Sequence, residues 1–273
     1  MNKVLFGLAT LTIGAAFLPA APPLVSQSLT ARAWANLQQG VTNKHSGKRM
    51  NAVHALRLLR EDPRAQEMAE SGLADPNAKV RAAAARTLGL MAALSAVPRL
   101  EAALDDKKPA VVLAAAHSLL LLGQPGKAYQ IDYEVLRGER KGANGFFASQ
   151  VDELKDSKAV AMMGVETGIG FAPFGGPAYD VFKRVRKDND SPVMAAATKE
   201  LAADRDPKID AALTRACTDK KWLVRAAAVY AIAKRGDPAL LSAITPALDD
   251  KNDTVRYDAS AAVLRLSGQT GLK

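Results

Sequence analysis

The chain has 273 residues, of which 48% are hydrophobic and 24% are charged, and this balance excludes a chain that is disordered throughout. Alanine is abundant, with 53 copies, whereas aromatic residues make up only 5%, which favours close-packed helices over a β-sandwich. The formal net charge is +9, and the single cysteine, Cys217, excludes an internal disulfide framework and any multi-cysteine metal site.

The N-terminal segment has the pattern of a Sec-type secretory signal peptide. Lys3 is followed by 15 uncharged residues, 4–18, and prolines then break this stretch, which is shorter than the roughly 20 residues that span a bilayer. We predict a signal peptide over residues 1–35, with cleavage after Ala33 or Ala35. Cleavage near Ala21 and an uncleaved membrane anchor are the alternatives. No later segment has the length and apolarity of a membrane span, so we expect a periplasmic or secreted protein.

A repeat organises the rest of the chain. Aspartates recur at steps of 31, 82, 31 and 31 residues, namely Asp75, Asp106, Asp188, Asp219 and Asp250. Aliphatic residues or alanine follow each of them at offsets of 5, 9 and 13 residues, which places them on one face of a helix. A second apolar stripe precedes each aspartate. Each unit is therefore predicted to be two helices joined by a short turn that carries the aspartate.

The repeat predicts an all-α fold. Weaker units begin at Asn43 and Asp156, so we expect an α-solenoid of about seven stacked antiparallel helix pairs over residues 36–268, followed by a tail at 269–273. Prolines fall where helices begin, and Gly89, Gly123 and Gly236 follow second helices as C-terminal caps would. The solenoid is irregular in its middle, where an insertion lies at about residues 124–143.

This pattern resembles the HEAT-repeat superfamily, in particular the short bacterial HEAT-like units related to those of phycobilisome lyases. The residues that carry the resemblance are 75–84 (DPNAKVRAAA) and 224–228 (VRAAA). The resemblance implies an armadillo-like helical array in which turn aspartates and second-helix arginines of neighbouring units form a structural ladder. The ladder residues would be Asp75, Arg81, Asp106, Asp188, Asp219, Arg225, Asp250 and Arg256, with Arg49 in the same arginine column.

The sequence offers no catalytic constellation. Nothing in the spacing brings His45, His54 and His117 together, and zinc-protease, nucleophile-elbow and phosphate-loop motifs are absent. Cys217 shares a column with apolar residues, so a buried side chain is favoured over a reactive thiol beside Lys220. We therefore expect no enzymatic activity, no metal and no cofactor.

The irregular centre is the predicted place for a specific contact. A segment rich in glycine and aromatic residues, 168–177, presents two phenylalanines that either seal the gap beside the insertion or contact a partner. The candidate partner-binding residues are Tyr129, Tyr133, Arg140, Lys141, Phe171 and Phe174.

These features predict an exported, non-catalytic scaffold that binds another protein through its solenoid surface and its centre. For an exported chain, the basic charge points to acidic proteins, to anionic glycans or lipid head groups of the envelope, or only to solubility, rather than to nucleic acid. An anionic envelope component is therefore a second candidate partner. The alternatives are a lyase-like or chromophore-handling protein, by analogy with phycobilin lyases, and a helical repeat protein that binds nucleic acid. Export disfavours both.

Overall fold

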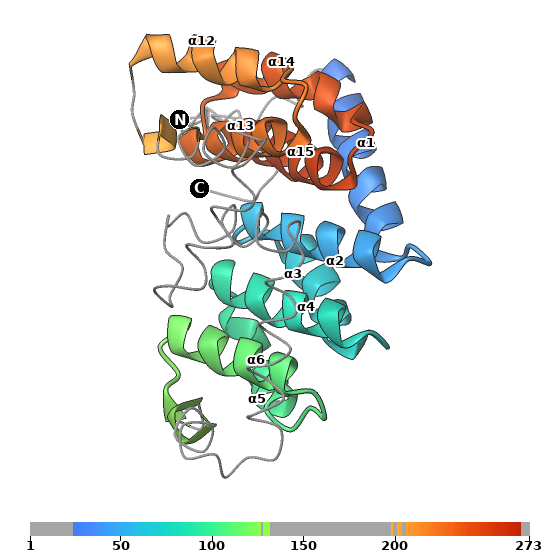
Figure 1. Cartoon of the computed structure of the whole chain (residues 1–273), viewed down its shortest axis with the longest axis vertical. Helices are drawn as coiled ribbons and strands as arrows, with labels where there is room; N and C mark the ends of the chain where they lie inside the picture. Colours follow the sequence, from blue (N-terminus) through green and yellow to red (C-terminus); the bar gives the residue numbers. More distant parts are fainter. Residues whose placement is uncertain (1–23, 127, 132–197, 199–200, 204–205, 269–273) are drawn as a thin grey trace, which may run out of the picture.

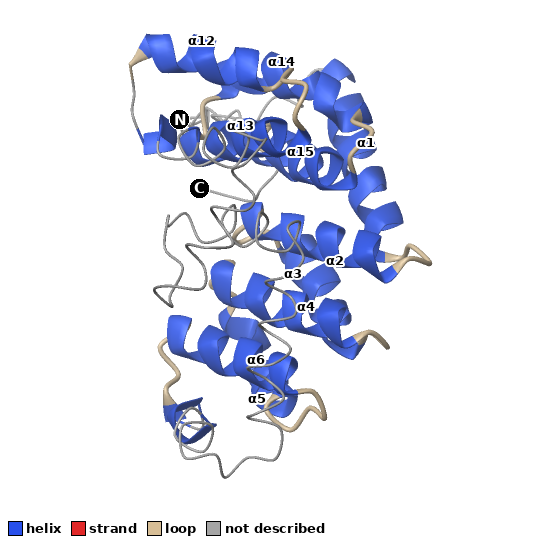
Figure 2. Ribbon diagram, in the orientation of Figure 1, coloured by secondary structure: helices blue, strands red, loops and turns tan. Residues whose placement is uncertain are grey.

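The computed structural model describes residues 24–126, 128–131, 198, 201–203 and 206–268. Within these ranges the regular secondary structure is helical and no strand occurs (Figure 2). The prediction of an all-α repeat fold is therefore confirmed. The predicted units that begin at Asp156 and Asp188 lie largely outside these ranges.

The N-terminal part of the described chain forms three helix pairs. They are α1 (Leu24–Val41) with α2 (Ser46–Ala55), α3 (Pro63–Ser71) with α4 (Ala78–Leu90), and α5 (Val97–Ala103) with α6 (Pro109–Leu121). Three 3-10 segments continue or precede these helices: η1 (Leu56–Leu58), η2 (Gly72–Ala74) and η3 (Leu94–Ala96).

The C-terminal part forms two further pairs. They are α12 (Pro207–Ala216) with α13 (Trp222–Arg235), and α14 (Leu241–Ile244) with α15 (Asp253–Leu266). The 3-10 segments here are η4 (Leu201–Ala203), η5 (Pro238–Leu240) and η6 (Thr245–Asp249).

Local sequence signals determine where the helices begin and end. The side chain of Asp62 accepts a hydrogen bond from the Ala65 N–H at the start of α3, which satisfies one of the unpaired donors there. Gly236 follows the last residue of α13 directly, and Gly123 is the second residue after the end of α6. Both take left-handed conformations, with φ of 68° and 70° respectively. Gly89 is different, because it lies inside α4 rather than beyond it.

Gly89 permits a close approach between α4 and α6, and the prediction that it caps α4 was wrong. A Cβ atom at Gly89 would lie only 2.9 Å from the Ser118 Cα of α6. The Ser118 hydroxyl donates a hydrogen bond of 2.8 Å to the Ala85 carbonyl, which joins the two helices at the same level. The close packing of α4 on α6 therefore explains why position 89 is a glycine.

The columns found in the sequence form the core of the stack. In the second helices the residues at offsets 5, 9 and 13 are 1% exposed or less. They are Val80, Ala84 and Leu88 in α4, Val111, Ala115 and Leu119 in α6, Val224, Ala228 and Ile232 in α13, and Val255, Ala259 and Val263 in α15. Alanine in the middle column lets neighbouring second helices pack closely.

The last helix pair packs against the first, which the sequence analysis did not predict. Helix α15 contacts both α1 and α2, so the spatial order of pairs is α12–α13, α14–α15, α1–α2, α3–α4 and α5–α6 (Figure 1). The sequence between α6 and α12 therefore begins at one end of the described stack and ends at the other. The sequence analysis placed this segment in the middle of a linear array. In the structure it connects the two outer helix pairs of the described stack.

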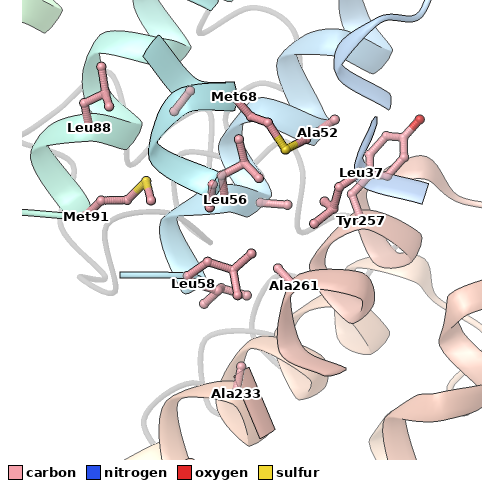
Figure 3. Close-up of a cluster of buried hydrophobic side chains, with 14 of the residues drawn as sticks. Leu37, Ala52, Leu56, Leu58, Met68, Leu88, Met91, Ala233, Tyr257 and Ala261 are labelled. Atoms are coloured by element: carbon pink, nitrogen blue, oxygen red, sulfur yellow. The ribbon is translucent and has the colours of Figure 1, made fainter. Parts of the chain in front are cut away.

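The apolar core is continuous across this junction. Leu37 of α1 and Leu56 of η1 lie near Tyr257 and Ala261 of α15 in one buried cluster (Figure 3). Gly40 allows the close approach, because a Cβ atom there would lie 2.5 Å from the Ala52 Cβ and 2.8 Å from the Tyr257 ring. A larger residue at position 40 would push the helices apart.

A buried ion pair also joins the two ends of the chain. Arg57 Nη1 lies 3.1 Å from Asp258 Oδ1, and the two side chains are 4% and 2% exposed. The same guanidinium lies 2.8 Å from the His54 carbonyl oxygen, to which it donates, and packs over the Tyr230 ring at 5.3 Å. Because both charges are out of water, each depends on the other for its stability.

Polar contacts at the edges of the junction complete it. The Asn36 side-chain amide donates to the Leu248 carbonyl at 3.0 Å and to Ser260 Oγ at 3.2 Å. In a further bond the donor belongs to the last unit: Arg265 of α15 donates to the Leu58 carbonyl of η1 at 3.0 Å. These contacts specify the position of the last unit on the first.

Helix α1 bears directly on the predicted cleavage positions. Ala33 and Leu37 have no exposed surface, and Arg32 pairs with Asp249 of the last unit. Cleavage after Ala33 or Ala35 would cut α1 and remove part of this contact. Cleavage near Ala21 would leave the whole of α1 in the chain.

We expect Asp258→Asn to lower the free energy of unfolding by about 3–5 kcal/mol, because it leaves the Arg57 charge buried without its counterion. Chemical denaturation followed by circular dichroism measures this. The double variant Arg57→Met with Asp258→Leu should recover most of the loss, since it removes both charges. Equal stability of Asp258→Asn and the unaltered protein would contradict the structural role of the pair.

Candidate functional site

Arginines of the second helices bind the turn aspartates of the neighbouring unit. Arg49 donates from Nε to Asp75 Oδ2 at 2.6 Å and from Nη2 to Asp75 Oδ1 at 2.8 Å. Arg81 makes the same two bonds to Asp106 at 2.7 and 2.9 Å. Arg225 makes them to Asp250 at 2.6 and 2.8 Å. Such paired bonds fix geometry as well as adding energy, and they are the contacts that the resemblance implies.

Each ladder arginine also holds its own turn. Nη1 of Arg49 donates to the Asn43 carbonyl at 2.8 Å, and Nη1 of Arg225 donates to the Asp219 carbonyl at 2.8 Å. The aspartate that receives the arginine also accepts a backbone N–H two residues later, as Asp75 does from Asn77 at 2.8 Å. The aspartates are thus occupied by protein donors, which indicates a structural role.

The ladder changes at the junction of last and first units. Arg256 still donates to the carbonyl of Asp250, at 2.6 Å, but its other terminal nitrogen pairs with Asp253 in its own helix. The next unit in space begins with Asn43 rather than an aspartate. Asp219 accepts a backbone hydrogen bond from Lys221, at 2.7 Å. Asp188 lies outside the described residues.

The candidate chemical groups remain apart in the described chain. His45 and His117 are exposed on different units, whereas His54 is buried beside Arg57. Cys217 is buried, and burial raises the pKa of its thiol to about 12, so the thiol is neutral at physiological pH. Among the residues that the structure describes, no three His, Cys, Asp or Glu side chains are grouped to hold a metal ion.

One of the predicted partner-binding residues can be placed. Tyr129 follows α6 and is 64% exposed. The other five, Tyr133, Arg140, Lys141, Phe171 and Phe174, lie outside the described residues. No described helix has the length and apolarity needed to cross a bilayer.

Three exposed leucines accompany Tyr129. Leu90 at the end of α4 is 41% exposed, Leu94 in η3 is 64% exposed, and Leu121 at the end of α6 is 52% exposed. Leu90 and Leu121 both follow their turn aspartates by 15 residues, so they occupy equivalent positions in adjacent units. We call these four residues the apolar edge. The sequence analysis missed the leucines because it compared the columns only as far as offset 13.

Comparison with known families agrees with this geometry. The sequence profile of the HEAT repeats family matches residues 67–131 and 180–265, which is more than half of the chain. The chain belongs to the HEAT repeat family. No curated protein matches it.

The chain also matches solved structures, at low TM-scores and low sequence identity. An engineered protein is 15% identical, with 89% of this chain and 98% of that chain covered and a TM-score of 0.29. Human deoxyhypusine hydroxylase in complex with glycerol is 15% identical, with 90% and 100% covered and a TM-score of 0.29. The complex of CpcE and CpcF of phycocyanin lyase from a Nostoc species is 17% identical, with 96% and 99% covered and a TM-score of 0.30.

The ladder gives the HEAT units a defined response to acid. The hydrogen bonds from Arg49 hold the pKa of Asp75 below its ordinary value, and those from Arg81 do the same for the pKa of Asp106. Because each pKa is lower in the folded than in the unfolded chain, the unfolded chain binds more protons in acid. The ladder therefore stabilises the fold fully above the ordinary aspartate pKa, and this contribution is lost as the pH falls through the lowered values.

We expect the double variant Arg49→Gln with Arg81→Gln to be less stable at neutral pH and to lose less stability in acid. The reason is that Asp75 and Asp106 lose the arginine hydrogen bonds that contribute most to lowering their pKa values. Urea denaturation between about pH 7 and about pH 2 measures both effects. Arg215→Gln, which changes an exposed arginine of α12, is the control. Identical acid profiles for the double variant and the control would contradict this role of the ladder.

Proposed function

We propose that the protein is an exported, non-catalytic HEAT-repeat scaffold that binds another protein through the apolar edge and the adjoining centre of the sequence. The observation that carries the proposal is the set of large apolar side chains exposed at the C-terminal ends of α4 and α6 or in the segments that follow these helices, namely Leu90, Leu94, Leu121 and Tyr129. Exposed large apolar residues that gather on one part of a fold are typical of partner contacts.

The rest of the stack supports this assignment by contrast. The core columns of the second helices are buried against neighbouring helices, so their apolar residues are used within the fold. The ladder aspartates Asp75, Asp106 and Asp250 are bound by arginines and by backbone N–H groups. The apolar edge has the leucines and the tyrosine that these internal contacts do not require. It also lies where the sequence enters the segment that holds the remaining predicted partner-binding residues.

Export rests on the N-terminal sequence. A positive start, an uncharged apolar stretch and prolines precede α1. In the proposal the signal peptide ends near Ala21, and α1 stays in the mature protein because it packs on α15.

We expect the double variant Leu94→Asp with Leu121→Asp to lose its partner while keeping its melting temperature, because both leucines are exposed. Affinity capture from the cell-envelope fraction, followed by mass spectrometry, identifies proteins that the unaltered chain retains and the variant does not. Truncation of central contact residues typically costs about 2 kcal/mol or more of binding energy.

The matched control is Ala211→Asp, which introduces a carboxylate at an exposed position of α12. It should retain the same proteins as the unaltered chain. Capture that is equal for the double variant and the control would overturn the assignment of the apolar edge.

We expect N-terminal sequencing of the native protein to begin at Ala21 or Pro22, since cleavage there preserves α1. A chain that starts at Asn36 lacks the part of α1 that contains Ala33 and Arg32, and it should melt at a lower temperature. A native N-terminus at Trp34 or Asn36, with unchanged stability, would contradict this cleavage position. A cytosolic protein that begins at Met1 would contradict export.

A further inference from the structure

The turns that join first and second helices form one continuous edge. Because α15 packs on α1 and α2, the turns follow one another in space in the order 217–221, 249–252, 42–45, 75–77 and 104–108 (Figure 1). Each turn carries an exposed lysine in the turn or within the next two residues. We call this set the basic edge, and its members are Lys220, Lys221, Lys251, Lys44, Lys79, Lys107 and Lys108.

Most acidic side chains at these turns are already paired. Asp75, Asp106 and Asp250 accept the ladder arginines. Asp249 pairs with Arg32 of α1, and Asp253 pairs with Arg256 and lies 3.7 Å from Lys48. Asp105 is an exposed carboxylate at this edge, and Asp219 accepts a backbone N–H from Lys221. Asp75, Asp106 and Asp250 are cancelled in charge by their ladder arginines, so the seven lysines outnumber Asp105 and Asp219 and give the edge its positive sign.

The residues at the helix starts point to the same conclusion. In α4, α6, α13 and α15 the N-cap residue lies two positions after the turn aspartate. Asn77 and Asn252 fill this position in two units, and their side chains accept backbone N–H groups. Lys108 and Lys221 fill it in α6 and α13, where they make no side-chain cap.

A lysine at an N-cap opposes the helix dipole and leaves backbone donors without a side-chain acceptor. Asparagine at the same place in sister units shows that the fold accommodates the better cap. A local choice that lowers stability at an exposed position is typical of a functional site.

We propose that the basic edge binds an acidic, extended segment of a partner protein. This inference rests on the proposed function and adds the chemistry of the partner. Helices pack about 8–10 Å apart, so the four intervals between five turns span about 32–40 Å. An extended chain of about 12 residues covers that length.

The width of the edge favours a single chain as the occupant. Each unit contributes one turn, so the lysines run in a single row, and carboxylates of an extended chain can meet them in succession. A lipid surface would instead contact a broad face. The apolar edge lies at the other ends of α4 and α6, so the two surfaces can be tested separately.

The test uses a fluorescently labelled oligoglutamate peptide of about 12 residues, matched to the length of the edge. Fluorescence anisotropy should show binding that weakens as salt is added, and an oligoglutamine peptide of equal length should not bind. The double variant Lys108→Asn with Lys221→Asn should bind the oligoglutamate about tenfold more weakly. It should melt at an equal or higher temperature, because it installs the caps of the sister units.

The control is Lys208→Gln with Lys234→Gln. It removes the same charge from exposed positions at the opposite ends of α12 and α13 and should bind the oligoglutamate normally. The Leu94→Asp with Leu121→Asp variant should also bind it normally.

Several results would overturn the proposal: equal affinity of the Lys108→Asn with Lys221→Asn variant and the control, or binding of anionic phospholipid vesicles or heparin without binding of oligoglutamate. A lower melting temperature of the asparagine variant would remove the argument from the helix caps. If oligoglutamate does not bind but partner capture still depends on the apolar edge, the basic edge fails while the proposed function stands. If oligoglutamate binds at the basic edge and capture ignores the apolar edge, the assignment of the apolar edge fails instead.

Discussion

The packing of α15 against α1 and α2 is the contact on which the described stack depends. A single helix pair has two apolar sides and cannot bury both alone, so each pair needs neighbours. In this protein the first pair obtains one neighbour from the following unit and the other from the end of the chain. Leu37 and Tyr257 illustrate the result, since both are buried in a cluster that exists only when the two ends meet (Figure 3).

Two kinds of charge pair hold the units in order. The ladder pairs lie at the edge of the stack, are partly accessible, and repeat from unit to unit. The Arg57–Asp258 pair is buried and occurs where the ladder arginine Arg256 meets a unit without a turn aspartate. A regular surface contact is thus replaced at the junction by a buried one. The buried pair also makes the position specific, because any other neighbour would leave a charge unpaired.

The sequence was sufficient to predict the repeat unit, but it was insufficient to predict the spatial order of the units. Columns such as Val80, Ala84 and Leu88 could be found because each contact recurs with the helical period and again with the repeat. The ladder was implied by the resemblance to HEAT repeats, on aspartates and arginines that recur at fixed positions of the unit. The contact between Arg57 and Asp258 joins residues 201 positions apart and occurs once, so it leaves no periodic signal. Gly89 was misread for a related reason, since a glycine near a helix end has the same sequence pattern whether it caps the helix or packs against Ser118.

The junction has a consequence for how the chain folds. Most contacts of a helical repeat protein are local, and such topologies fold fast. Helix α1 is an exception, because the surface it presents to α15 stays uncovered until the end of the chain has been synthesised. During synthesis the N-terminal units expose this apolar face in partly folded intermediates, which are prone to aggregate. Packing of the last unit on the first therefore completes the folding of the stack. A chain that ends before Asp253 would leave the first unit without one of its two neighbours.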